Sequence, residues 1–583
     1  MRSEGRRKIN VVLVGVVVTI VAAIPLMMLG LWKNGTGHDM FFHLLRIEGI
    51  CEGIKNGQFP VKIQPGWYNG YGYACSVFYG DVFLWIPALL HLAGLPLQTS
   101  YKAFVFLSNL GTFYIAYISI KGIFKDGYIA SFGAAWYTLS LYRMINVYIR
   151  HAVGEHTAMM FFPLIGYALF CLLNEKPERA RGEVALILGV TGILQSHIIS
   201  FEISICVIAI VCLIYINRSL KKEIILSFLK AVALTVLINL WFLVPFLDYM
   251  KTGSFNANTI NEYKMSVDIG DSGLFLKQIF GICYDAGGVN LPVSRGTEGE
   301  MPLGVGIGSA IVLIPGFWVI CKRWKNMDEK QAKLGAVMMT GALVSLWLAS
   351  IYFPWGKLEE IHKVIRYAII NIQFPWRFLG ISSVLITLLA CFALSERNRI
   401  VYMLVSVSFA VLLLSDAYML YDETRVSDKV YVYDIEDLNT CEPSGEEYLP
   451  YGTNVNELLD EDVRVTNVTI EDWEKKYLTF AASIANNSDE TGYVLTPLLY
   501  YAGYKAIMED GERSPLEITY GINKRALITI PGGTKGILRV YWSKPIIWRI
   551  SEIISLISIV LMIIYKCLKK SHSEIFPNSL INT

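Results

Sequence analysis

Long apolar runs dominate this sequence and decide its class. About 12 of them approach or reach the roughly 20 residues that a helix needs to cross a bilayer. The runs are 9–31, 101–121, 127–146, 157–173, 184–197, 201–216, 224–247, 303–321, 334–353, 374–394, 400–420 and 545–565. Hydrophobic residues make up 54% of the chain and charged residues only 17%, which is far from the composition of a soluble domain. We therefore expect a polytopic α-helical membrane protein with about 12 transmembrane helices.

The distribution of lysine and arginine predicts the topology. The first apolar run follows the basic start MRSEGRRK and has no small-residue cleavage motif, so it is expected to be an anchor rather than a signal peptide. Segment 81–95 is apolar but short, and Pro87 and His91 interrupt it. If it stays outside as a re-entrant or interfacial helix, the side of the N-terminus is shared by the basic loops KGIFKD, NEKPERARGE, NRSLKKE, CKRWKNMDEKQAK and SERNR and by the tail KCLKK. Both termini are then cytoplasmic.

Composition divides the chain into three parts. Residues 1–420 form the predicted membrane domain, with a first outer loop at 32–100, and residues 545–583 form the last membrane helix and a cytoplasmic tail. Residues 421–544 are more polar, and their strand-like runs VRVTNVTI, GYVLTPLLYY, RALITI and ILRVYW are separated by turn formers. This pattern predicts an extracytoplasmic β-sandwich-like domain that either holds the acceptor polymer over the site or merely caps it. Most of its aromatic residues are expected to fill a sandwich core, with glycan contact as the alternative.

Charge and cysteine content exclude some functions. The net charge is only +2, and no basic stripe with interleaved aromatic residues is present, so no nucleic acid partner is expected. The ten cysteines contain no CxxC pair and read as buried thiols. A disulfide between Cys51 and Cys75, which share a loop, is the alternative if that loop faces an oxidising compartment.

The segment GHDMFFHLLR holds three polar side chains just after the first apolar run. Asp39, His43 and Arg46 are spaced so that a helix would place them on one face. Such groups are costly at a membrane boundary, which favours a functional role. The alternative is that Asp39 caps the helix and the other two residues are interfacial.

Three later motifs add charged or polar groups at predicted outer helix ends. Glu155 lies in RHAVGEH close to Arg150, and its alternative role is a helix cap or a local ion pair. His197 lies in QSHIIS and by itself suits a hydrogen-bonded structural histidine. Arg377 lies in QFPWRFLG, just inside a predicted span, where an unpaired guanidinium would be expensive. We therefore expect Arg377 to face a polar cavity or to bind an anion.

Taken in succession, these motifs resemble a known family. GHDMFFHLLRIEGI, GQFPVKIQPGWYNGYGYACSVFYGD, YIRHAVGEH, QSHIIS and QFPWRFL resemble bacterial integral membrane proteins catalogued as "6-pyruvoyl-tetrahydropterin synthase-related". These belong to the GT-C group of polyprenyl-phosphate-sugar-dependent glycosyltransferases, and the resemblance covers residues 9–420. The catalogue name does not describe the expected activity, because pterin synthase chemistry needs a zinc site and the eight histidines offer no such set.

The resemblance implies a GT-C-like fold and a site on the extracytoplasmic side of the cell membrane. Asp39 would be the general base that activates the acceptor hydroxyl, and Glu155 a second catalytic carboxylate. A polyprenyl-phosphate-linked sugar would be the donor, and a cell-envelope glycan or polymer the acceptor. Cationic and hydrogen-bonding groups would stabilise the departing phosphate. The residues expected to bind that phosphate or the substrate are His43, Arg46, Arg150, His197 and Arg377.

Some alternatives stay open at this point. No cofactor is required by the motifs, although a divalent cation, Mg²⁺ or Mn²⁺, between Asp39 and Glu155 would suit two carboxylates. A transporter or flippase for lipid-linked sugars could use the same charged outer cavity, and so could a non-catalytic assembly protein. The sequence shows no internal symmetry of the kind common in transporters, which favours the enzyme.

Overall fold

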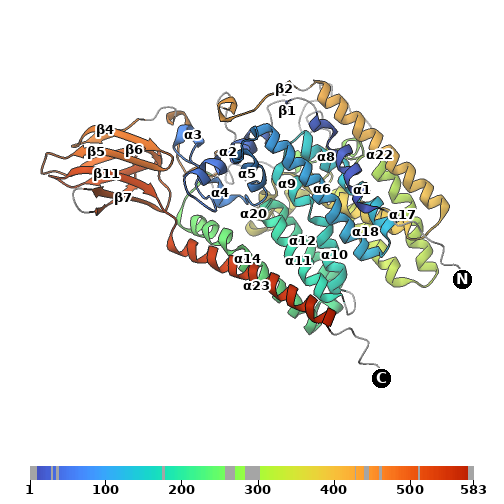
Figure 1. Ribbon diagram of the computed structural model, residues 1–583. Coiled ribbons are helices and arrows are strands. Elements are labelled where there is room, and N and C mark those ends of the chain that lie inside the picture. Colours follow the sequence, from blue (N-terminus) through green and yellow to red (C-terminus); the bar gives the residue numbers. More distant parts are fainter. Residues whose placement is uncertain are drawn as a thin grey trace. The chain divides into compact units, whose positions relative to one another are not determined.

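The computed structural model describes residues 10–27, 30–33, 39–173, 178–256, 269–281, 303–426, 428–438, 445–458, 462–509 and 513–575. The chain forms two compact units (Figure 1). The first, here called the helical unit, comprises Met1–Cys51, Asp81–Ile224 and Asn258–Gly445. The second, here called the mixed unit, comprises Glu52–Gly80, Ile225–Ala257 and Glu446–Thr583. Segments distant in sequence therefore share each unit.

Apolar helices dominate the chain. Within the described residues, eight helical segments are long and apolar enough to cross a membrane, and α1 (Val11–Ala22) and α12 (Ile198–Ile214) are shorter apolar helices. The eight are Leu97–Phe124, Val153–Leu173, Lys222–Lys251, Ile307–Lys325, Glu329–Leu348, Pro375–Leu394, Arg399–Asp422 and Ile546–Ile564. The prediction of a mostly helical chain with several apolar helices is confirmed, while a total of about 12 spans stays a prediction.

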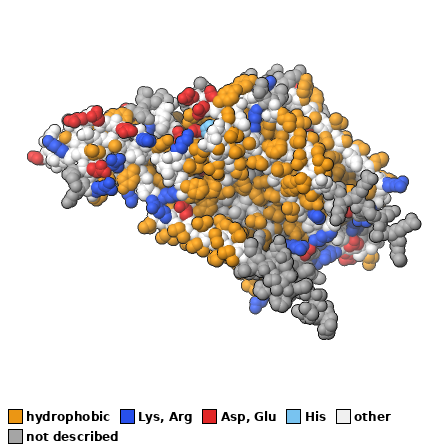
Figure 2. Space-filling model, in the orientation of Figure 1, with side chains coloured by type: hydrophobic (Ala, Val, Ile, Leu, Met, Phe, Trp, Pro, Cys, Tyr) orange, Lys and Arg blue, Asp and Glu red, His pale blue; other side chains and the backbone are white. Residues whose placement is uncertain are grey.

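Many apolar side chains on these helices point outward. Hydrophobic side chains cover much of the helical surface in the view of Figure 2. Ile118, Leu229 and Leu414 are 58%, 60% and 72% exposed, respectively. Extended apolar surface is uncommon on soluble monomers and is expected where helices face lipid.

Several predicted apolar runs are not single helices, among them 127–146 and 9–31. Run 127–146 divides into α7 (Gly127–Thr138) and α8 (Leu141–Tyr148). The break lies at Leu139 and Ser140, where Ser140 has an extended backbone and its hydroxyl donates to the carbonyl of Tyr137. In run 9–31, α1 ends at Ala22 and a 3-10 turn, η1 (Ile24–Met27), follows around Pro25, which cannot donate a helical hydrogen bond.

The other helices of the helical unit frame the candidate site. They are α2 (Met40–Lys55, whose last turn enters the mixed unit), α5 (Trp85–Leu92), α6 (Leu97–Phe124), α9 (Val153–Met159), α10 (Phe162–Leu173), α11 (Arg179–Leu194), α17 (Ile307–Lys325), α18 (Glu329–Leu348), α19 (Trp355–Glu359), α20 (Lys363–Ile372), α21 (Phe378–Leu394) and α22 (Arg399–Val426). Helix α5 lies in the predicted re-entrant segment 81–95 and has eight residues. At about 1.5 Å per residue it is too short to cross a hydrocarbon core of about 30 Å by itself.

The mixed unit contains two antiparallel sheets near the C-terminus. The strands are β3 (Arg464–Thr466), β4 (Thr469–Lys476), β5 (Thr479–Ala485), β6 (Gly492–Leu499), β7 (Tyr504–Glu509), β8 (Arg513–Leu516), β9 (Ile518–Tyr520), β10 (Arg525–Ile530) and β11 (Lys535–Trp542). One sheet has the order β3-β6-β10-β9 and the other β4-β5-β11-β7-β8. Alternate residues of β5 and β7 are buried, as expected for a sheet with one packed face. The predicted C-terminal β-rich region is confirmed.

Aromatic side chains in this region divide between core and surface. Tyr501 and Tyr504 are 2% and 5% exposed and belong to the core, whereas Trp473 is 39% exposed. Cys51 and Cys75, the pair considered for a disulfide, are both free thiols.

Two long helices and the loop 52–80 complete the mixed unit. Helix α14 (Lys222–Thr252) lies beside α23 (Ile546–Ile575), and the Trp548 indole N–H donates to Asp248 at 2.8 Å. The amide of Leu499 in β6 donates to the carbonyl of Tyr71 at 3.0 Å. Residues 52–80 thus pack with the C-terminal part of the chain.

Candidate functional site

The first site residue, Asp39, stands at the start of α2 in the helical unit. Its carbonyl accepts from the amide of His43 at 3.1 Å, which begins the helix, and its own amide donates to the carbonyl of Arg150 at 3.3 Å. The Asp39 side chain is exposed. Within the described part of the chain, its carboxylate has no hydrogen bond to a helix amide and no ion-pair partner. The main chain thus fixes Asp39 beside Arg150.

His43 and Arg46 share a face of α2, as their spacing predicts, and both are buried. Arg46 Nη2 donates to Asp81 at 2.5 Å, and its Nη1 lies 3.2 Å from His43 Nδ1. Burial, followed by the nearby Arg46 charge, lowers the pKa of His43 well below its ordinary value. A neutral His43 that accepts from Arg46 at Nδ1 carries its hydrogen on Nε2.

Glu155, in the first turn of α9, is the centre of a buried network. Its Oε2 lies 2.8 Å from Arg150 Nη1 and 3.7 Å from Arg377 Nε. Its Oε1 accepts from the Tyr142 hydroxyl and, at 3.5 Å, from Asn146 Nδ2. Because both oxygens have donors, Glu155 resembles an anchor for cations more than a free base.

The geometry around Glu155 follows from how α8 ends. Tyr142, Asn146 and Arg150 are four residues apart, so one side of this helical stretch faces Glu155. The amides of Ile149 and Arg150 both donate to the carbonyl of Ile145, which closes the helix. His151 then adopts a φ of 50°, in the left-handed region, and the chain turns into α9. This turn brings Glu155 back beside Arg150.

Arg377 reaches the same network from a distant part of the sequence. It ends the 3-10 turn η3 (Pro375–Arg377) that leads into α21, and Gln373 before it has a φ of 64°. Arg377 Nη1 donates to the carbonyl of Ile372 at 2.5 Å, and its guanidinium lies 5.3 Å from the centroid of the Phe374 ring. Among the described residues, Arg377 meets the Glu155 carboxylate.

His197 caps the start of α12. Its Nδ1 accepts from the Ser200 amide at 3.2 Å and lies 2.8 Å from the Ser200 hydroxyl. This bond is the structural role that the sequence suggests for a lone histidine. The ring also lies within electrostatic range of Glu155 and Arg377.

The charged groups in this region shift one another's pKa values. Burial of its carboxyl group raises the pKa of Asp39 above its ordinary value, while Arg150 and Arg377 oppose the increase and Glu155 adds to it. Burial is the largest influence and lowers the pKa of Arg150, but Glu155, Tyr142 and Asp39 together outweigh it, so the pKa is raised. Arg150 therefore stays charged beside both carboxylates.

We call Asp39, Arg150, Glu155 and Arg377 the charged cluster. His197 lies within electrostatic range of this cluster and of His43, whereas Arg46 is held in its ion pair with Asp81. A contact between Arg46 and a donor phosphate stays a prediction.

Sequence reasoning did not single out Tyr142 or Asn146, although their four-residue spacing before Arg150 is a detectable signal. It also missed Asp81, the partner of Arg46, for which the local sequence gives no comparable signal.

The prediction of a metal ion between Asp39 and Glu155 also stays untested. Among the described residues, no group of three or more His, Cys, Asp or Glu side chains is placed to hold a metal ion. In the structure, the oxygens of Glu155 are occupied by donors from the protein itself.

No family model matches the chain, and no curated protein matches it in sequence. Among solved structures, it is similar to the crystal structure of the Archaeoglobus fulgidus oligosaccharyltransferase in the apo form, with a TM-score of 0.36 and 12% sequence identity. The match covers 72% of this chain and 56% of that chain, so little more than half of the archaeal protein is represented. A TM-score this low supports no inference about fold or activity, and none is drawn from it.

Proposed function

We propose that this protein is a membrane glycosyltransferase of the GT-C type. It transfers a sugar from a polyprenyl-phosphate donor to a cell-envelope glycan or polymer at the extracytoplasmic face of the membrane. The observation that carries the proposal is the charged cluster, in which Asp39 lies within electrostatic range of two buried guanidinium groups that Glu155 holds. The apolar helices and the sequence resemblance given above add support.

In the proposed reaction, Asp39 accepts the proton of an acceptor hydroxyl as its oxygen attacks the anomeric carbon of the donor sugar. The bond between that carbon and the phosphate oxygen breaks, and the polyprenyl phosphate leaves with the electron pair. Arg150 and Arg377 stabilise the negative charge that develops on the phosphate. Because the donor lipid stays in the bilayer, the site must lie at the membrane boundary.

Glu155 has a positioning role in this proposal. It holds Arg150 at 2.8 Å and Arg377 at 3.7 Å, so both cations are oriented before substrate binds. Such preorganisation avoids the cost of reorienting the cations during the reaction. His43 and His197 are proposed as supporting hydrogen-bond donors. Both chain termini are proposed to be cytoplasmic, and residues 421–544 extracytoplasmic.

The direct test uses the full-length protein in proteoliposomes. A panel of radiolabelled sugars linked to polyprenyl phosphate is supplied as donor, with isolated cell-envelope polymer as acceptor. The proposal requires label to appear in the polymer and polyprenyl phosphate to be released in equal amount. Movement of intact donor between leaflets without label in the polymer would instead support a flippase.

The pH dependence of transfer is a separate prediction. Asp39 must be deprotonated to act as a base, and its pKa is raised by desolvation. Transfer should therefore fall with decreasing pH at a higher pH than an unperturbed aspartate would give. Arg150 lowers the pKa of Asp39, so Arg150→Gln should move the acid limb of the kcat/KM profile to still higher pH.

The matched control for this prediction is Arg397→Gln. Arg397 is 61% exposed and lies 3.6 Å from Asp126, outside the charged cluster, so its loss should leave the acid limb unchanged. An acid limb that stays in place or moves to lower pH in the Arg150 variant would contradict the electrostatic role given to Arg150.

Metal dependence is tested by chelation. In the proposed mechanism the two guanidinium groups supply the positive charge, so transfer should persist in EDTA. Loss of transfer in EDTA that Mg²⁺ or Mn²⁺ restores would instead support an ion held by Asp39 and Glu155.

A further inference from the structure

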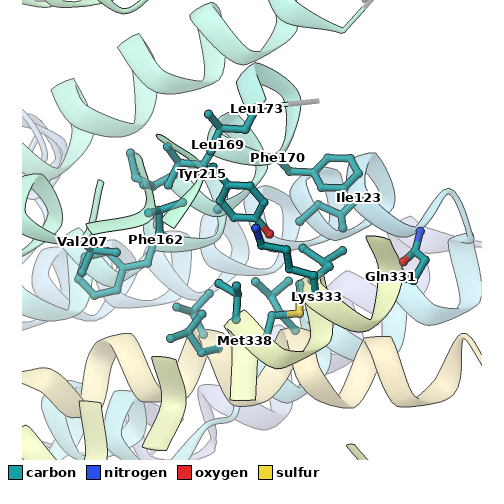
Figure 3. Close-up of a pocket in the computed structure, with 18 of the residues that line it drawn as sticks. Ile123, Phe162, Leu169, Phe170, Leu173, Val207, Tyr215, Gln331, Lys333 and Met338 are labelled. Atoms are coloured by element: carbon teal, nitrogen blue, oxygen red, sulfur yellow. The ribbon is translucent and has the colours of Figure 1, made fainter. Parts of the chain in front are cut away.

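A cavity of about 640 Å³ lies inside the helical unit, apart from the charged cluster. Helices α10, α12, α18 and α21 line most of it (Figure 3). Its volume is within the range of small-molecule sites, about 300–1,000 Å³. Along most of its length the lining is apolar, with Phe162, Leu169, Val207 and Met338 among the side chains that bound it.

The lining residues show that the cavity extends along α10 and α12. On α10 they run from Phe162 to Leu173, which is about 16 Å along a helix. On α12 they run from Ser204 to Tyr215. The apolar end at Phe162 lies next to Gly380, three residues after Arg377, because a Cβ built on Gly380 would meet the Phe162 ring at 3.0 Å. The other end coincides with the ends of α6, α10 and α12 and the start of α18.

Basic side chains gather at this second end. Lys333 is exposed, and its ammonium lies 4.8 Å from the centroid of the Tyr215 ring, as Figure 3 also shows. Arg218 donates to the carbonyl of Leu173 at 2.8 Å, which leaves other guanidinium hydrogens at the rim. Lys125 is paired with Glu178 at 2.5 Å. Glu329 and Lys330 also line the cavity. Among the charged lining residues, lysine and arginine outnumber glutamate.

We propose that this cavity binds one anionic phospholipid. Its hydrocarbon chains occupy the apolar length toward Phe162, and its phosphate contacts Lys333 and Arg218 at the rim. Three observations support this occupant: the long apolar lining, the basic rim, and the position of that rim at the ends of apolar helices. Basic pockets between membrane helices on the cytoplasmic side favour anionic head groups, and these loops are the ones whose lysines and arginines predict that side.

The proposal is independent of glycosyl transfer, because lipid occupancy can be measured with no sugar donor present. The full-length protein is purified in mild detergent, and retained lipids are identified by native mass spectrometry. It is then exchanged into nanodiscs of neutral lipid containing a small fraction of phosphatidylglycerol. We expect one anionic phospholipid per chain, and about tenfold or greater loss of phosphatidylglycerol affinity in the double variant Lys333→Gln, Arg218→Gln.

Two further variants make the test specific. Lys221→Gln removes an exposed lysine that does not line the cavity, and it should retain the lipid. Lys333→Gln alone leaves the hydrogen bond from Arg218 to Leu173 intact. A loss of phosphatidylglycerol affinity in this single variant therefore cannot result from loss of that bond. Unchanged affinity in both Lys333 variants, or retention of polyprenyl phosphate in place of phospholipid, would overturn the proposal.

Discussion

Replacing Asp39 with asparagine is expected to lower sugar transfer by about 10²- to 10⁴-fold, the usual contribution of a positioned general base. Asparagine preserves the size of the side chain and the main-chain bond to Arg150 but cannot accept the hydroxyl proton. Because Asp39 is exposed, the variant should fold and insert as the parent does. The measurement is the rate of label transfer from polyprenyl-phosphate sugar to polymer in proteoliposomes.

Asp271→Asn is the matched control, since Asp271 is also an exposed aspartate of the helical unit and no interaction of its side chain with another described residue is found. Transfer by this variant should equal that of the parent protein. If Asp39→Asn retains full transfer, Asp39 is not the base. If neither the parent protein nor the Asp39→Asn variant transfers sugar, but both move lipid-linked sugar across the bilayer, the transporter alternative gains support.

The second large effect concerns stability. Replacing Glu155 with glutamine removes the only carboxylate within 4 Å of Arg150 and Arg377 among the described residues. Both guanidinium groups are buried, so the variant removes a compensating negative charge from a poorly hydrated environment. Breaking a buried ion pair in this way costs about 3–5 kcal/mol. Thermal or denaturant unfolding in detergent micelles should show a large loss, together with reduced transfer.

The comparison variant is Glu178→Gln, which breaks the more exposed pair with Lys125. An exposed ion pair contributes about 0–1 kcal/mol, so this change should scarcely alter unfolding. Equal effects of the two substitutions would contradict the central role of Glu155. A double variant, Glu155→Gln with Arg377→Met, should recover part of the lost stability, because it removes one of the two buried guanidinium charges that Glu155 neutralises.

The broad architecture follows from local patterns in the sequence. Apolar runs such as 400–420 coincide with helices because hydropathy over about 20 residues depends on no distant partner. The runs RALITI and ILRVYW coincide with β10 and the end of β11 for a similar reason, since alternation and β-branched residues are local signals.

Breaks within apolar runs are harder to predict. Run 127–146 is continuous in hydropathy and has no proline or internal glycine at residues 139–140, yet the helix stops there. A hydrogen bond from the Ser140 hydroxyl to the Tyr137 carbonyl accompanies the change of direction. Competition between a serine hydroxyl and backbone groups is too weak a signal to identify such a break in advance.

Some contacts of the site join residues that are close in sequence, and others join distant segments. The ion pair of Arg150 and Glu155 spans five residues, and its existence could be considered from the sequence alone. The approach of Arg377 depends on the packing of a distant segment, which hydropathy does not encode. Tyr142 was concealed within an apolar run, although a buried carboxylate needs donors of this kind.

The bond between the Asp39 amide and the Arg150 carbonyl involves main-chain atoms only. The backbone of Arg150 therefore positions Asp39, and the Arg150 side chain supplies a positive charge. A series of side chains at this position, such as lysine, glutamine and methionine, would alter the acidity of Asp39 while the anchoring bond persists. Substitutions at this one position should therefore change the basicity of Asp39 in steps. The change in transfer rate with different acceptor hydroxyls would then report how far proton transfer has advanced in the transition state.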